Sequence, residues 1–105
     1  MRDYPVKRTV KKNLKENGLK NIMEKYFEGV KEEGELISAS YGAMKKIAAK
    51  FDGKNLWVET DTDASASDDL VLKTVKVYNA FLQEATGYTA KERKKLANKA
   101  AKEGT

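Results

Sequence analysis

The segment AMKKIAAKFDGKNLWVET, residues 43–60, contains two apolar runs separated by a turn sequence at residues 52–55. Side chains alternate between the two faces of a β-strand, so Leu56 and Val58 would share one face and Trp57 would lie on the other. Asp-Gly in the turn favours a tight hairpin connection. The segment therefore predicts two antiparallel strands that bury one face.

The first of the two runs is less clear than the second. As a strand, it would place Lys45 on the buried side, so a helix over residues 43–51 remains an alternative. In the strand interpretation, the core residues are Ala43, Ile47, Ala49 and Phe51, and the opposite face carries Met44, Lys46, Ala48 and Lys50.

Outward from this hairpin, the region 30–62 contains a further turn signal at Glu33-Gly34, which predicts a meander of three or four antiparallel strands. At the N-terminus, Pro5 and the alternation of Tyr4 and Val6 suit a short edge strand, or a basic arm, within residues 1–17.

Three helices are predicted around the strands. The first covers residues 18–28 and ends at Gly29; the second covers residues 68–86, with Ser65 or Ser67 as its cap and Gly87 as its end. The apolar face of the first helix comprises Leu19, Ile22, Met23, Tyr26 and Phe27. The apolar stripe of the second comprises Val71, Val75, Tyr78, Leu82 and Ala85, widened by Leu70, Val77 and Phe81.

A third helix begins at Thr89, where Thr89 and Glu92 form a capping box, and it covers residues 89–103. The order is then helix, three strands, helix, helix. We expect a single α+β domain over residues 1–105, a two-layer sandwich with an antiparallel sheet of three to four strands, two core helices on one face of the sheet and a peripheral basic C-terminal helix.

Composition limits the chemistry. The 105 residues include no cysteine and no histidine, which removes thiolate nucleophiles, the commonest general base and the commonest transition-metal ligands. We therefore expect a non-catalytic protein without cofactor or metal, and no catalytic residues are proposed. No apolar run is long enough to span a membrane, and we expect a cytoplasmic protein.

The net charge is +5 and is unevenly distributed. Residues 1–20 contain seven basic and two acidic residues, and residues 91–103 contain six basic and two acidic ones. In contrast, residues 59–69 contain five acidic residues and no basic one. That segment begins like a calcium-binding loop but lacks the glycine and the glutamate that such a loop requires, so helix capping and solvation explain it better than metal binding.

The last helix has one basic face, formed by Lys91, Lys94, Lys95, Lys99 and Lys102. Its other face carries Ala90, Leu96, Ala97, Ala100 and Ala101, with Arg93 among them. A row of lysines can follow a nucleic-acid backbone, but it can also be the solvated face of a surface helix.

A second candidate site lies on the sheet, where Trp57 would be adjacent to Lys46 and Lys50 on the face away from the first two helices. An aromatic side chain flanked by lysines can hold single-stranded nucleic acid by stacking and charge. The alternative is that the last helix, or a second subunit, packs over Trp57.

The segments YPVKR, SYGAMKKI, LWVET and YNAFLQEATGYTAKERKK together resemble a small uncharacterised family of archaeal proteins, found mainly in methanogens. The resemblance extends over nearly the whole chain. It implies a cytosolic archaeal protein of about this length and carries no activity, cofactor or binding residue that could be assigned to positions here.

Two functional hypotheses follow from the sequence. The first is a small basic domain that binds RNA or DNA without strong sequence specificity. The alternative is a domain for protein–protein interaction, including a homodimer, in which the open sheet face and the alanine stripe pack against another subunit. Binding to phosphates should weaken with salt, whereas an apolar interface should persist.

Overall fold

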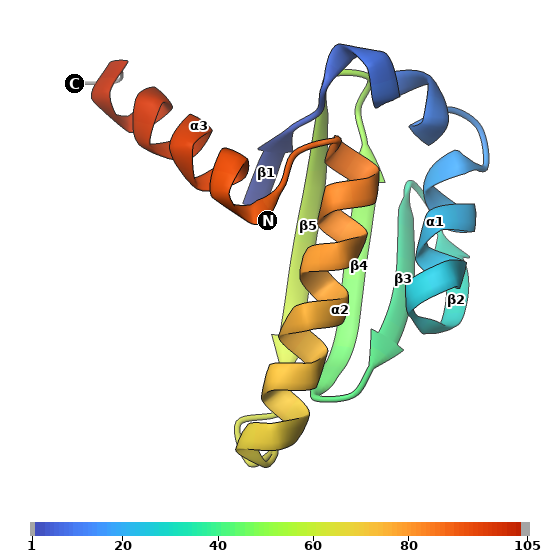
Figure 1. Ribbon diagram of the computed structural model, residues 1–105. Coiled ribbons are helices and arrows are strands. Elements are labelled where there is room, and N and C mark those ends of the chain that lie inside the picture. The colour runs from blue at the N-terminus through green and yellow to red at the C-terminus, as the bar shows by residue number, and fades with distance from the viewer. Residues whose placement is uncertain (1, 104–105) are drawn as a thin grey trace.

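The computed structural model describes residues 2–103, except for the side chains of residues 97 and 99–103. A short strand and a 3-10 helix precede the first α-helix, four further strands follow it, and two helices end the described chain (Figure 1). The elements are β1 (Arg2–Pro5), η1 (Arg8–Leu14), α1 (Gly18–Tyr26), β2 (Glu28–Glu33), β3 (Leu36–Tyr41), β4 (Met44–Phe51), β5 (Asn55–Thr62), α2 (Asp68–Thr86) and α3 (Ala90–Glu103).

Within the described residues, five strands form one antiparallel sheet in the order β1-β5-β4-β3-β2. The α+β prediction is confirmed, but the strand count of three to four is too low. The meander supplies β2 to β5, and the fifth strand is β1, which pairs Tyr4 with Leu56 at the sheet edge. A four-residue strand that ends in a proline is a weak pattern, and pairing with its distant partner β5 stabilises it.

The alternative of a helix over residues 43–51 is wrong, because this segment forms strand β4. A β-bulge explains the lysine that seemed misplaced: Met44 pairs with Thr62 and Lys46 with Asp61, so Lys45 is the extra residue and is exposed. The bulge also turns Met44 into the core, where it is 4% exposed, which corrects its predicted position on the opposite face.

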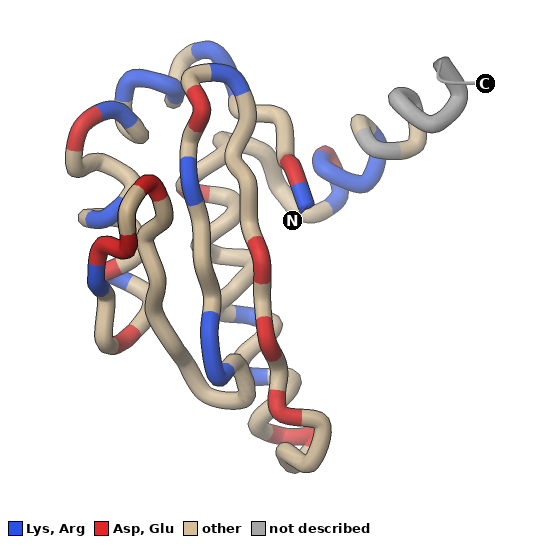
Figure 2. The backbone as a smooth tube through the Cα atoms, turned by 180° about the vertical axis from the view of Figure 1, so that it is seen from behind, with Lys and Arg blue, Asp and Glu red and all other residues tan. Residues whose placement is uncertain are grey.

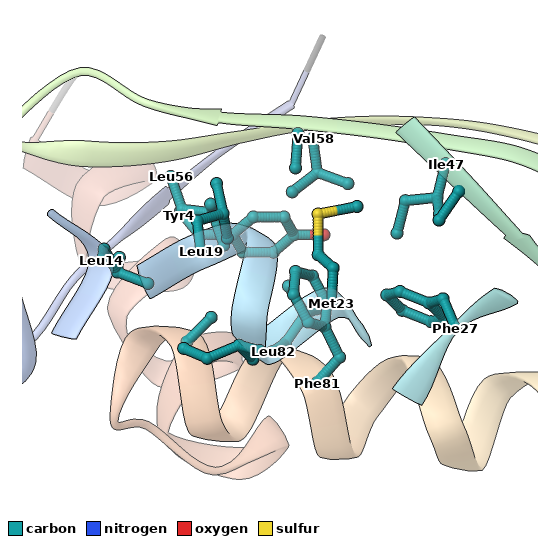
Figure 3. Packing of buried hydrophobic residues seen from close by; sticks show 14 of the residues in the cluster. Tyr4, Leu14, Leu19, Met23, Phe27, Ile47, Leu56, Val58, Phe81 and Leu82 are labelled. Carbon is teal, nitrogen blue, oxygen red and sulfur yellow. The ribbon is translucent and has the colours of Figure 1, made fainter. Parts of the chain in front are cut away.

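Helices α1 and α2 cover one face of the sheet, as predicted, and enclose the hydrophobic core between the two layers (Figures 1 and 3). Phe27 and Phe81 meet edge to face at 5.0 Å between ring centroids. The fully buried side chains include Met23, Ile47 and Leu82, and each large apolar side chain buried in this way contributes about 1.5–3 kcal/mol to folding.

The first helix ends earlier than predicted. Helix α1 stops at Tyr26, and Gly29, expected as its left-handed end, lies in β2 with φ 61° at a second register shift, between Glu28 and Lys31. Glycine is favoured in both settings, so the residue type alone did not distinguish a helix end from a bulged strand.

The apolar face of α2 also differs from the prediction. Val75 is 46% exposed, and its place on the core side is taken by Thr74, which is 3% exposed. The Thr74 hydroxyl accepts a hydrogen bond from the Ala43 N–H at 2.9 Å and donates to the Leu70 carbonyl at 2.7 Å. A buried threonine with both bonds satisfied fits here as well as an aliphatic residue, which periodicity of apolar residues cannot detect.

Candidate functional site

The fold brings the two basic segments of the sequence next to each other. The Lys7 N–H, just before η1, donates a 2.8 Å hydrogen bond to the Thr86 carbonyl at the end of α2. The Lys7 ammonium lies 5.3 Å from the centre of the Tyr88 ring, in the short connection to α3. The start of the N-terminal basic segment is therefore fixed beside the connection from α2 to α3, and η1 and α3 leave this point on opposite sides of α2 (Figure 1).

We call the cationic side chains of these two segments the basic end. All of them are exposed or half-buried, and no salt bridge among the described residues involves them. The basic end consists of Lys7, Arg8, Lys11, Lys12 and Lys15, which lie within η1 or directly next to it, and of Lys91, Lys94 and Lys95 on α3.

The acidic segment lies at the opposite end of the long axis of α2, where β5 leads through a loop into α2 (Figures 1 and 2). Ser67 caps α2 by accepting a bond from the Leu70 N–H, and Asp68 and Asp69 lie in the first turn. The Asp63 carboxylate accepts bonds from the hydroxyl and the N–H of Ser65, which hold its pKa below the ordinary value. These contacts agree with the interpretation as a capped, solvated loop.

Helix α3 projects away from the sheet instead of lying across it (Figure 1). Its predicted capping box is present: the Glu92 carboxylate accepts from the Thr89 N–H, and the Thr89 hydroxyl accepts from the Glu92 N–H. On the predicted apolar face, Ala90 is exposed and Leu96 is half-buried. The predictions for the side chains of Ala97, Lys99, Ala100, Ala101 and Lys102 lie outside the described residues.

Of the two lysines predicted beside Trp57, only Lys50 is its direct neighbour. Lys50 pairs with Trp57, whereas Lys46 lies four residues before Lys50 on β4 and pairs with Asp61. No helix covers this face in the described chain, so the alternative in which α3 packs over Trp57 is wrong (Figure 2).

The surroundings of Trp57 are mixed in charge. Its indole N–H donates to the Asp52 carboxylate at 2.7 Å, and Asp3 is its neighbour on β1. The Lys46 ammonium bonds to Glu33 at 3.3 Å. A phosphate backbone over Trp57 would therefore meet carboxylates as well as lysines.

A cleft that the sequence did not reveal lies between β1, α2 and the first turns of α3, with a volume of about 930 Å³. Its walls bring together Arg2 and Tyr4 from β1, Tyr78 and Asn79 from α2, and Arg93 from α3, among other residues. The Tyr4 and Tyr78 hydroxyls are hydrogen-bonded at 3.1 Å. No local pattern connects positions 74 residues apart, so only the β1–β5 pairing reveals the cleft.

The described residues offer neither a cluster of metal ligands nor a membrane-spanning helix. In the described part of the chain, no cluster of three or more carboxylate, imidazole or thiolate side chains could hold a metal ion. Among the same residues, no helix has the length and apolarity to cross a bilayer.

Comparison with known proteins places the chain among uncharacterised archaeal proteins. No curated protein matches it. The solution structure of the hypothetical protein TA0095 from Thermoplasma acidophilum, determined by NMR, is similar: it is 40% identical, the match covers 92% of this chain and 97% of that one, and the TM-score is 0.63. The sequence profile described as "Domain of unknown function (DUF5611)" matches residues 1–99. The predicted resemblance to an uncharacterised archaeal family is thereby confirmed, and the chain belongs to the DUF5611 family.

Proposed function

We propose that this protein is a small non-catalytic domain that binds the phosphate backbone of RNA or DNA through its basic end, without reading the base sequence. The observation that carries the proposal is the Lys7–Thr86 hydrogen bond, because it holds the N-terminal basic segment at the same end of the molecule as the start of α3. Both basic segments thus begin at one end of the molecule, and the acidic segment lies at the other end (Figure 2). Such a charge distribution orients a polyanion toward one end.

The basic end is a better contact surface for phosphates than the open sheet face around Trp57. Lysines of the basic end have no carboxylate partner among the described residues, whereas Lys46 bonds to Glu33 and Trp57 bonds to Asp52. Each unpaired lysine that meets a phosphate releases a condensed counterion, which gives a steep dependence on salt. Stacking on Trp57 is not required.

The test is fluorescence anisotropy of labelled single-stranded and duplex RNA and DNA, titrated with protein at several salt concentrations. The variants Lys11→Gln/Lys12→Gln and Lys91→Gln/Lys95→Gln each remove two charges from the basic end. Each should reduce the slope of log K against log salt by about 0.9 for every phosphate that is no longer neutralised. The matched control is Lys73→Gln/Lys76→Gln, which removes the same charge from exposed positions on α2 outside the basic end.

Three results would contradict the proposal. The first is absence of binding at low salt. The second is an equal loss of affinity in the control variant, which would mean that net charge alone matters. The third is quenching of Trp57 fluorescence by single-stranded nucleic acid, which would move the contact to the open sheet face.

A second candidate is self-association, and one observation favours it: Leu72 and Val75 are 61% and 46% exposed on α2. Side chains three residues apart on a helix lie on the same side, so together they offer a small apolar surface. A dimer formed through them should persist in high salt and dissociate in Leu72→Gln/Val75→Gln, as measured by sedimentation velocity.

A further inference from the structure

The cleft between β1, α2 and α3 has the size of a ligand site and an unusual set of polar groups. Its volume of about 930 Å³ falls within the range of about 300–1,000 Å³ that is typical of sites for small molecules. It is lined by residues of the edge strand β1 and of α3, and β1 lies beside the point where α3 leaves the body of the molecule (Figure 1).

The cleft is positively charged. Arg2, Arg93 and Lys94 line it, and Asp3 is the one carboxylate among its described lining residues. The sum is a local charge of about +2.

Arg93 is the central group of this set because it is only 8% exposed. Its guanidinium donates to the Tyr88 carbonyl at 2.7 Å and to the Asn79 side-chain oxygen at 3.1 Å, and both acceptors are neutral. No carboxylate of the described residues forms a salt bridge with it. Burial lowers the pKa of Arg93, but an arginine remains protonated at neutral pH, so the charge is buried without a counter-charge.

Neutral hydrogen-bond donors complement the cations. Because the Asn79 oxygen accepts from Arg93, its amide nitrogen is left as a donor. The Tyr4 and Tyr78 hydroxyls share one hydrogen bond, which uses one of their two hydrogens and leaves the other to donate elsewhere. Burial raises the pKa of Tyr78 well above its ordinary value, so this hydroxyl stays protonated.

Part of the wall is apolar. Pro5, Leu82, Ala90 and Leu96 line the cleft beside the donors. A ligand that filled the cleft would therefore place an anionic group against the cations and a compact apolar group against this wall.

We propose that the cleft binds a phosphate monoester of a small organic molecule with an apolar body. A phosphate monoester carries about −1.5 to −2 charges at neutral pH, which balances the local charge, and its three terminal oxygens are acceptors for the donors that β1, α2 and α3 contribute to the lining. This inference goes beyond the proposed nucleic-acid binding and does not depend on it.

The experiment is a titration of the ¹⁵N-labelled full chain with phenyl phosphate, followed in ¹H–¹⁵N spectra that include the arginine Nε–H and asparagine side-chain signals. Phenyl phosphate should shift the signals of Asn79 and Arg93 and should bind more tightly than inorganic phosphate. Phenol, which has the ring without the charge, should leave these signals unchanged.

Two matched double variants separate a cleft from general electrostatic attraction. Arg2→Gln/Lys94→Gln removes two charges that line the cleft, and Lys73→Gln/Lys76→Gln removes two exposed charges of α2 outside the described lining. The first should weaken phenyl phosphate binding by about tenfold or more, because charged donors contribute most to such contacts; the second should leave it unchanged. Arg93 also anchors α3, so it is not substituted. Tyr78→Phe, which removes one hydroxyl, should weaken binding severalfold while the spectrum of the free protein stays dispersed.

Three results would overturn the inference. Equal weakening in both double variants would show attraction by net charge alone. Absence of shifts at Asn79 and Arg93 up to millimolar phenyl phosphate would show that the cleft does not bind this class. Shifts of the same signals on dilution of the free protein, without an effect of the probe, would show that a second copy occupies the cleft.

Discussion

Asp52 connects the turn between β4 and β5 to the side chain of Trp57. Its carboxylate accepts hydrogen bonds from the Asn55 N–H at 2.7 Å, the Lys54 N–H at 2.8 Å and the indole N–H of Trp57 at 2.7 Å. All three bonds favour the charged form, and they lower the pKa of Asp52 from 3.8 to about 2, with the Asn55 N–H as the main cause.

This contact predicts a fluorescence titration at acid pH. Because the folded-state pKa is depressed, the contribution of Asp52 to stability is fully present above the ordinary carboxyl pKa and is lost as pH falls toward 2. The emission of Trp57 should change over the same range as its hydrogen bond breaks. The Asp52→Asn variant should lack the transition; a transition that persists in this variant would assign it to acid unfolding as a whole.

At the level of elements, Gly87 lies where the end of α2, the start of η1 and the connection to α3 meet. It ends α2 in the left-handed conformation, with φ 79°, and a Cβ at this position would lie 3.0 Å from the Cβ of Lys7 and 3.1 Å from a methyl group of Val10. Glycine therefore serves both the backbone conformation and the close approach of η1 to the end of α2.

The comparison of Gly87→Ala with Gly34→Ala should separate these two roles. Gly34 also has a positive φ, 66°, but a Cβ there would meet nothing within 4 Å. Gly34→Ala should cost about 1 kcal/mol for the left-handed backbone alone. Gly87→Ala should cost about 1–3 kcal/mol more, because the new methyl group crowds the contact with η1. Urea denaturation measures both, and equal costs would show that η1 is not held closely against Gly87.

The ends of the helices could be predicted from the sequence where they depend on residues that are close together in the chain. The capping box of Thr89 and Glu92, the Ser67 cap and the Gly87 end depend on residues close together in the chain, and the structure contains all of them. The bulge at Lys45 and the edge strand β1 depend on pairing with β5, which no short window of sequence contains. The buried position of Thr74 depends in the same way on the N–H of Ala43, 31 residues away.

At the scale of the whole molecule, α3 is attached to the core but is not part of it. No described side chain of α3 belongs to the hydrophobic cluster that α1, α2 and the sheet enclose. Its described polar attachments to the body include the two hydrogen bonds of Arg93.

A chain that stops at Thr89 should therefore remain folded. Removal of the Arg93 bonds and of the packing of Leu96 should reduce the free energy of unfolding by about 1–3 kcal/mol, with a single cooperative transition in urea. The truncated chain should also lose most of its salt-dependent affinity for nucleic acid, because the α3 part of the basic end is removed. Disappearance of the cooperative transition would show that α3 is needed for the core.

Features of the candidate sites that lie within one element could be predicted from the sequence, and features that join distant segments could not. The exposed positions of Lys91, Lys94 and Lys95 on α3 and the pairing of Lys50 with Trp57 could be predicted, because each depends on the period of one helix or one pair of adjacent strands. The position of the N-terminal basic segment at the same end of the molecule as the start of α3, and the cleft lined by Arg2, Tyr78 and Arg93, could not, because each joins segments from opposite ends of the chain.

The pairing of β1 with β5 determines when β1 can join the sheet while the chain is being synthesised. A ribosome synthesises β1 first, but the residues that pair with it, 55–58, emerge only after the whole of α1 and the next three strands. Contacts between such distant segments form late, whereas β2 to β5 can pair hairpin by hairpin as they appear. Among the five described strands, β1 is therefore made before the others but joins the sheet last, and until then Tyr4 and Val6 remain without their partners.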